Sequence, residues 1–83
     1  MAAEIEYKES VFKDLKNIGL PHAKRNVVNL ENELQKNPHT GLPLKGEFEG
    51  LFKLRIGDYR VIYTKTTTGV LVLRIAHRKK AYK

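Results

Sequence analysis

Residues 51–65 read LFKLRIGDYRVIYTK. Apolar and polar residues alternate through 51–56, as expected for a β-strand with one buried face. Gly57 and Asp58 supply a two-residue hairpin turn, and a second strand returns through 59–65. The stretch therefore predicts an antiparallel hairpin, around which the rest of the chain is arranged.

Further elements are expected on both sides of this hairpin. Residues 66–69 form a looser turn into another strand over 70–77. Upstream, residues 38–49 are rich in Gly and Pro, which indicates a crossing loop. At the N-terminus, residues 4–7 alternate and predict a short first strand.

A pair of helices is predicted between the first strand and the loop. Ser10 can cap the first helix, which Gly19 ends, while Pro21 fits the first turn of the second helix, which ends at Asn37. The apolar positions at helical spacing are Val11, Phe12, Leu15 and Ile18 in the first helix, and Ala23, Val27, Leu30 and Leu34 in the second. The expected fold is therefore α+β, in the order β-α-α-β-β-β, with the helical hairpin packed on one face of a small antiparallel sheet.

Composition indicates one small basic domain. The chain has 83 residues, enough for a single domain over 1–83, and 16 Lys and Arg against nine acids give a net charge of +7. That charge favours an anionic partner. There is no cysteine and no carboxylate cluster, so we expect no disulfide, no metal and no cofactor. No signal-peptide pattern or membrane-length apolar run is present, which predicts a soluble cytoplasmic protein with no membrane contact.

Strand alternation predicts a cationic face on the sheet. If the helices cover Phe52, Leu54 and Ile56, the opposite face of that strand carries Lys53 and Arg55. On the last strand, the same parity places Leu71, Leu73 and Ile75 in the core and Val70 and Val72 on the other face. The cations expected to share the face away from the helices are Lys53, Arg55, Arg60, Arg74 and Arg78. None of these three strands adds an acid to that face, which favours a phosphate-binding surface.

The C-terminal residues 74–83, RIAHRKKAYK, hold five Lys and Arg and no acid. Cations neutralise phosphate, a histidine such as His77 can move a proton near neutral pH, and an aromatic ring such as Tyr82 can stack on a base. The predicted contacts to a nucleic-acid backbone are Arg55, Arg74, Lys79 and Lys80.

The sequence resembles the RelE group of the RelE/ParE toxin superfamily. The resemblance rests on LKG at 44–46, LFKLRIGDYRVIY at 51–63 and IAHRKKAY at 75–82. It implies the toxin of a type II toxin-antitoxin module, which cuts mRNA on the ribosome without a metal and is silenced by an acidic, RelB-like antitoxin.

The resemblance also implies roles for individual residues. Lys53 matches the strand lysine that acts as base or electrostatic partner, and Arg60 the arginine that clamps the phosphate. Arg78 matches the arginine at the leaving group, and Tyr82 the aromatic residue that orients or stacks the base. Leu51 stands where many relatives have a second lysine.

Two questions stay open at this stage. The general base could be Lys53, His77, or a loop glutamate at Glu47 or Glu49, although His77 falls on the core parity of its strand. The main alternative function is a ParE-like inhibitor of DNA gyrase with no nuclease activity. The basic ending that includes Tyr82 favours the nuclease, because a ParE-like ending more often has a Gly and an acid among its arginines.

Overall fold

The computed structural model describes residues 4–37 and 40–77. Within these ranges the chain forms two α-helices, a short 3₁₀ helix and five strands. Their bounds are β1 (Glu4–Tyr7), α1 (Glu9–Ile18), α2 (Leu20–Lys36), β2 (Leu42–Pro43), η1 (Gly46–Phe48), β3 (Leu51–Ile56), β4 (Tyr59–Lys65) and β5 (Gly69–His77). None of the helices in this part of the chain is long and apolar enough to cross a membrane.

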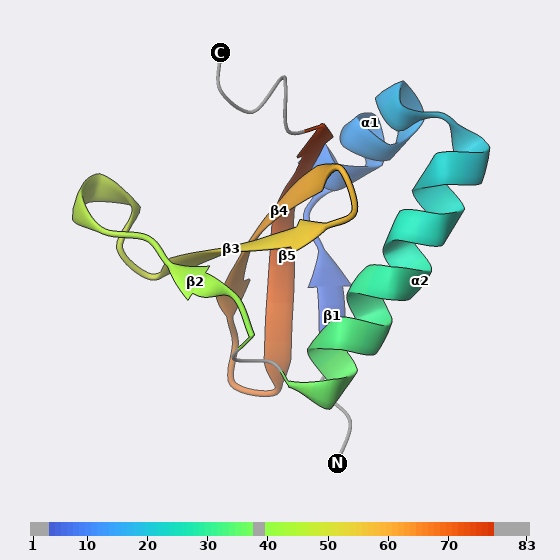
Figure 1. The fold of residues 1–83 in the computed structure, drawn as a ribbon. Helices are drawn as coiled ribbons and strands as arrows, with labels where there is room; N and C mark the ends of the chain where they lie inside the picture. The colour runs from blue at the N-terminus through green and yellow to red at the C-terminus, as the bar shows by residue number, and fades with distance from the viewer. Residues whose placement is uncertain (1–3, 38–39, 78–83) are drawn as a thin grey trace.

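The strands form one sheet in the order β1-β5-β4-β3-β2. β3, β4 and β5 make the antiparallel meander that the sequence predicts, and β1 pairs in parallel with the start of β5. In Figure 1, α1 and α2 lie on one side of this sheet, and the segment with β2 and η1 extends away from the helices. The predicted α+β fold is confirmed.

Gly19 separates the two helices as expected. Its φ of 95° lies in the region that favours glycine, and its N–H donates to the carbonyl oxygen of Leu15 at 3.2 Å. The prediction for Ser10 was wrong, because Lys8 occupies the N-cap position and Ser10 lies inside α1. The Ser10 hydroxyl instead donates to the carbonyl oxygen of Leu73 at 2.7 Å, where β5 runs beyond the end of β1.

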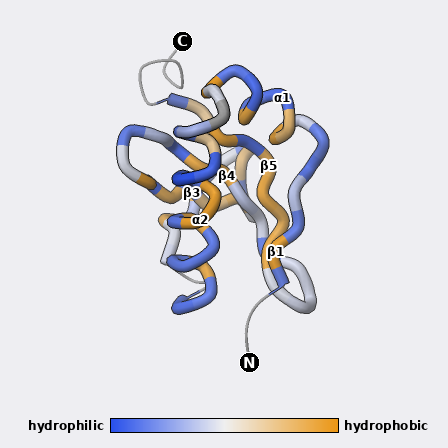
Figure 2. The backbone as a smooth tube through the Cα atoms, turned by 90° about the vertical axis from the view of Figure 1, so that its right-hand side faces the viewer, coloured by the Kyte–Doolittle hydropathy of each residue, from blue (hydrophilic) through white to orange (hydrophobic). Residues whose placement is uncertain are grey.

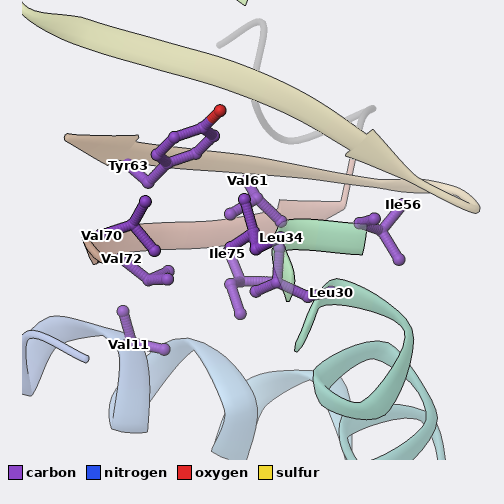
Figure 3. Close-up of a cluster of buried hydrophobic side chains, with 9 residues drawn as sticks. All are labelled: Val11, Leu30, Leu34, Ile56, Val61, Tyr63, Val70, Val72 and Ile75. Atoms are coloured by element: carbon purple, nitrogen blue, oxygen red, sulfur yellow. The ribbon is translucent and has the colours of Figure 1, made fainter. Parts of the chain in front are cut away.

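The core lies between the helical hairpin and one face of the sheet (Figure 3). It consists of Val11, Leu30, Leu34, Ile56, Val61, Tyr63, Val70, Val72 and Ile75. Figure 2 shows hydrophobic colour along the central strands, whereas α2 alternates between hydrophobic and hydrophilic turns. The expectation that Phe12 packs in this core was wrong: Phe12 is 61% exposed because α1 presents Val11 and Leu15 to the sheet.

A β-bulge in β5 overturns part of the predicted strand parity. Tyr63 pairs with Val72 whereas Ile62 pairs with Arg74, so Leu73 is an extra residue between them. An extra residue shifts the alternation by one, which returns Arg74 to the face away from the core. Before the bulge, Val70 and Val72 are fully buried in the core, although they were predicted to lie on the opposite face. The prediction that Leu71 and Leu73 lie in the core was wrong for the same reason.

The region predicted as a plain crossing loop contributes a fifth strand. β2 pairs with β3 through Leu42 and Pro43, and a proline is tolerated there because β2 is an edge strand. Just before it, the Gly41 N–H donates to the Tyr63 hydroxyl oxygen at 2.9 Å. A Cβ at Gly41 would collide with the Tyr63 ring, so this close approach needs glycine.

Candidate nucleic-acid interface

Three cations from three neighbouring strands surround Ile62 on the sheet face opposite the core. Ile62 of β4 lies between Lys53 of β3 and Arg74 of β5, its direct partners in the two ladders. Arg60 lies two residues before Ile62 on the same face. Diagonal neighbours in a sheet are about 7–8 Å apart, so Arg60 is within side-chain reach of both Lys53 and Arg74.

These three cations line an open groove of about 1010 Å³. Its apolar lining includes Leu51, Ile62, Leu73 and Ala76. One wall comes from Leu44 and Phe48 of the segment after β2, and the other from Asp14, Asn17 and Ile18 of α1. Phe48 is 53% exposed, so a large aromatic surface stands beside the cations. We call this surface, with Lys53, Arg60 and Arg74 as its cations, the basic groove.

Asp14 brings the basic groove an acid that the strands lack. One of its oxygens, Oδ2, accepts hydrogen bonds from Arg74 Nε and from the backbone N–H of Ile75, both at 2.9 Å. The other, Oδ1, accepts from Arg74 Nη2 at 3.1 Å. These hydrogen bonds and the negative charge of Asp14 raise the pKa of the Arg74 guanidinium. The expectation of a face free of acids was therefore incomplete, since α1 supplies one at its edge.

Lys53 and Arg55 differ in their surroundings. Lys53 is partly buried, and its side-chain ammonium has no hydrogen-bond or ion-pair partner among residues 4–37 and 40–77. Arg55 is exposed, and its Nε donates to the carbonyl oxygen of Gly57 at 3.3 Å. Arg55 also lies directly opposite Arg60 in the ladder, so two like charges are adjacent at this end of the sheet.

His77 packs against an aromatic residue at the end of β5. It pairs with Tyr59, and the two rings meet edge to face with centroids 5.3 Å apart and an interplanar angle of 87°. The register gives both residues the parity of the core, as the sequence indicated for His77, although both also line the end of the basic groove. This contact provides a structural role for His77 beside the catalytic one suggested by the sequence.

The fold that carries the basic groove is that of a known protein family. Residues 5–82 match the family described as the ParE toxin of the type II toxin-antitoxin system, parDE. The chain belongs to this family, within the RelE/ParE toxin superfamily.

Its relatives include RelE toxins. Toxin RelE of Mycobacterium tuberculosis is 42% identical over 53 residues, which are 60% of this chain and 55% of that protein, so the match spans about half of the relative. The crystal structure of the M. tuberculosis toxin-antitoxin complex RelBE2 superposes with a TM-score of 0.82 at 28% identity, over 94% of this chain and 100% of that one. The Escherichia coli DinJ-YafQ complex gives a TM-score of 0.72 at 21% identity over the whole of both chains, which supports the fold alone.

Several predicted site residues of the toxin fall where the structure gives no description. Arg78, Lys79, Lys80 and Tyr82 lie outside the described residues. Glu47 belongs to η1 and Glu49 follows it, and both are exposed.

Sequence reasoning missed Asp14 and Phe48 of the toxin. Asp14 could have been noticed, because an acid lies between Val11 and Leu15 on the buried stripe of α1, where a partner is expected. Phe48 gave no such signal, since only the folding of residues 44–48 over the sheet brings it to the groove.

Proposed function

We propose that this toxin is an endoribonuclease that cleaves mRNA on the ribosome. The observation that carries the proposal is the placement of Lys53 and Arg60 on adjacent strands of one open groove with an aromatic wall. A cationic track with stacking surfaces is what single-stranded RNA requires. The M. tuberculosis relative named Toxin RelE supports the nuclease branch of the superfamily.

The reaction needs no metal in this scheme. The ribose 2′-OH loses its proton to a base and attacks the adjacent phosphorus, which forms a P–O2′ bond. The P–O5′ bond breaks, and the leaving oxygen takes up a proton, so the products are a 2′,3′-cyclic phosphate and a 5′-OH. Rate enhancement comes from proton transfer and from cations around the phosphate oxygens.

Each step has a candidate residue. Lys53 serves as base or electrostatic partner of the 2′-OH, and Arg60 clamps two phosphate oxygens through its planar guanidinium. Arg78 supplies cation and donor at the leaving oxygen, and Tyr82 stacks on or orients the base. His77 is the alternative base, and it would have to act from its place against Tyr59.

An acidic antitoxin of the RelB type is the proposed partner. The M. tuberculosis RelBE2 and E. coli DinJ-YafQ structures are toxin-antitoxin complexes. The net charge of +7 would steer an acidic partner, so association should be faster at low salt.

The decisive experiment is cell-free translation with the purified chain, followed by mapping of mRNA 5′ ends. The expected result is cleavage within ribosome-bound codons that leaves a 5′-OH. Arg60→Lys should slow cleavage, because a point charge cannot replace a bidentate clamp. Arg78→Ala should cost about two to three orders of magnitude, like the loss of one transition-state donor. Arg25→Ala, an exposed cation on α2, is the charge-matched control and should cleave normally.

Tyr82 is tested in the same assay. Tyr82→Ala should slow cleavage about ten- to a hundredfold if the ring stacks on a base, since stacking contributes about 1–3 kcal/mol. Tyr82→Phe should be mild if stacking dominates and severe if the hydroxyl takes part. If Arg60→Lys, Arg78→Ala and Tyr82→Ala all cleave mRNA at the parental rate, the active site lies elsewhere on the protein.

A second function is favoured by the family description itself, which names the ParE toxin. A ParE-like chain would poison DNA gyrase and hydrolyse nothing. Trapped gyrase on cleaved DNA, with intact mRNA in the translation assay, would identify this activity.

A further inference from the structure

The guanidinium of Arg74 is only partly used within the fold. An arginine has five N–H donors, and Asp14 takes one at Nε and one at Nη2. The other three have no acceptor among residues 4–37 and 40–77. The Arg74 side chain is 60% exposed and lines the basic groove. It therefore presents unused charged donors to whatever enters the groove.

Asp14 is itself held in place. Its side chain is only 10% exposed, and its Oδ2 also accepts the N–H of Ile75, a buried residue of β5. That backbone bond fixes the carboxylate beside the bulged strand. The carboxylate in turn accepts two hydrogen bonds from Arg74, and this bidentate geometry both stabilises the pair and fixes the orientation of the guanidinium.

We infer that Asp14 and Arg74 form a preorganised anchor for a backbone phosphate of the RNA. Arg74 makes the contact, and Asp14 is the positioning residue that aims it. The inference rests on the proposed function, and it adds a phosphate-binding role to the edge of the groove beside α1.

The anchored phosphate is distinct from the one that is cleaved. Arg74 lies two strands away from Lys53, and neighbouring strands are about 4.8 Å apart, so their backbones are separated by about 10 Å. Asp14 holds the Arg74 guanidinium toward α1, on the side of the groove away from Lys53, so this contact holds a neighbouring nucleotide and sets which phosphate meets Lys53 and Arg60. Positioning of this kind contributes to rate by orienting the reacting atoms.

If only net charge mattered, removal of Asp14 would change RNA binding in the direction opposite to the one that the anchor predicts. Deleting an acid beside an anion-binding site strengthens the local positive potential, and RNA binding should then tighten. If Asp14 aims Arg74, its loss releases the guanidinium into many rotamers, and RNA binding should weaken. The sign of the change in affinity therefore separates positioning from charge.

The test uses a single-stranded RNA of about ten nucleotides with 2′-O-methyl riboses, which can bind but cannot undergo 2′-OH attack. Arg74→Ala should weaken binding about tenfold and lower the slope of log affinity against log salt by about 0.7, the value for one phosphate contact. Asp14→Asn should also weaken binding, by about three- to tenfold, and should have no further effect once Arg74 is alanine.

Two controls separate binding from folding and from net charge. Ser10→Ala removes another hydrogen bond between α1 and β5 without touching a cation, and it should leave RNA binding and its salt slope unchanged. Arg25→Ala removes one positive charge on α2 and should leave the slope unchanged as well. Circular dichroism and thermal unfolding of Asp14→Asn verify that the measured protein is folded.

The outcomes also distinguish the anchor from the proposed activity. Tighter binding by Asp14→Asn, an unchanged salt slope in Arg74→Ala, or no measurable binding by the parent would overturn the anchor even if mRNA is cleaved. Arg74- and Asp14-dependent binding by a chain that leaves ribosomal mRNA intact would retain the anchor and reject the nuclease.

Discussion

Asp14 and Arg74 share an ion pair, yet the two residues should contribute unequally to stability. The perturbation is a pair of alanine variants, Asp14→Ala and Arg74→Ala, compared with the parent. Asp14 receives three hydrogen bonds, one of them from the buried N–H of Ile75, whereas the side chain of Arg74 is 60% exposed.

The structure gives the size of each effect. Asp14→Ala leaves the Ile75 N–H without its acceptor, and an unsatisfied buried donor costs about 1–3 kcal/mol. It also removes the ion pair, which contributes at most about 1 kcal/mol because Arg74 is largely solvated. Arg74→Ala removes only that pair, since water can take the place of the guanidinium. We expect a loss of about 1–4 kcal/mol for Asp14→Ala and about 1 kcal/mol or less for Arg74→Ala.

Guanidinium chloride unfolding followed by circular dichroism measures the difference. With a slope of about 2 kcal/mol/M for a small domain, the midpoint should fall by about 0.5–2 M for Asp14→Ala and by about 0.5 M or less for Arg74→Ala. Equal midpoint shifts for the two variants would refute the reasoning, because the ion pair alone would then account for the stability. An Asp14→Ala variant as stable as the parent would show that the Ile75 hydrogen bond contributes nothing.

Three further predictions concern other parts of the toxin. Gly41→Ala should destabilise the fold by about 1–3 kcal/mol in the same unfolding assay, because the added Cβ meets the buried Tyr63 ring. Gly46→Ala is the control for backbone strain without a collision, since its φ is +70° and its added Cβ meets nothing within 4 Å. Burial, together with the charge of Glu31 and a hydrogen bond to it, raises the pKa of Tyr7 above its ordinary 10.0. The phenol of the unfolded chain therefore ionises first, and the stability of the fold should decrease as pH rises above 10. Tyr7→Phe should reduce this loss of stability in alkaline unfolding curves. A 2′-O-methyl group at the cleaved nucleotide should block mRNA cleavage completely, and cleavage at that position by primer extension would contradict attack by the 2′-OH.

The β3-β4-β5 meander shows which structural features the local sequence pattern can predict. The bounds of β3 and β4 follow from alternation and from the Gly57-Asp58 turn, which depend only on neighbours in sequence. The ends of the helices follow in the same way from Gly19 and Asn37. The side chains of Lys53 and Arg60 therefore could be assigned to one face in advance.

The predictions failed where the position of a residue depends on how one element packs against another. The bulge at Leu73 reverses the parity of Val70 and Val72, and the alternating sequence of β5 gives no sign of it. Ser10 resembles a helix cap in sequence, but it lies against the Leu73 carbonyl that β1 is too short to reach. Phe12 has helical spacing, yet the orientation of α1 on the sheet leaves it exposed.

The sequence by itself determined the α+β order, the hairpin, the basic character and the face that carries Lys53 and Arg60, because these follow from side-chain period, turn chemistry and charge. Only the tertiary structure decided that Asp14 of α1 holds Arg74 of β5 and that Phe48 forms a wall of the same groove. Contacts between residues 60 positions apart depend on how helix and strand pack and on which backbone groups remain unpaired at a sheet edge. Those conditions exist only once the chain has folded.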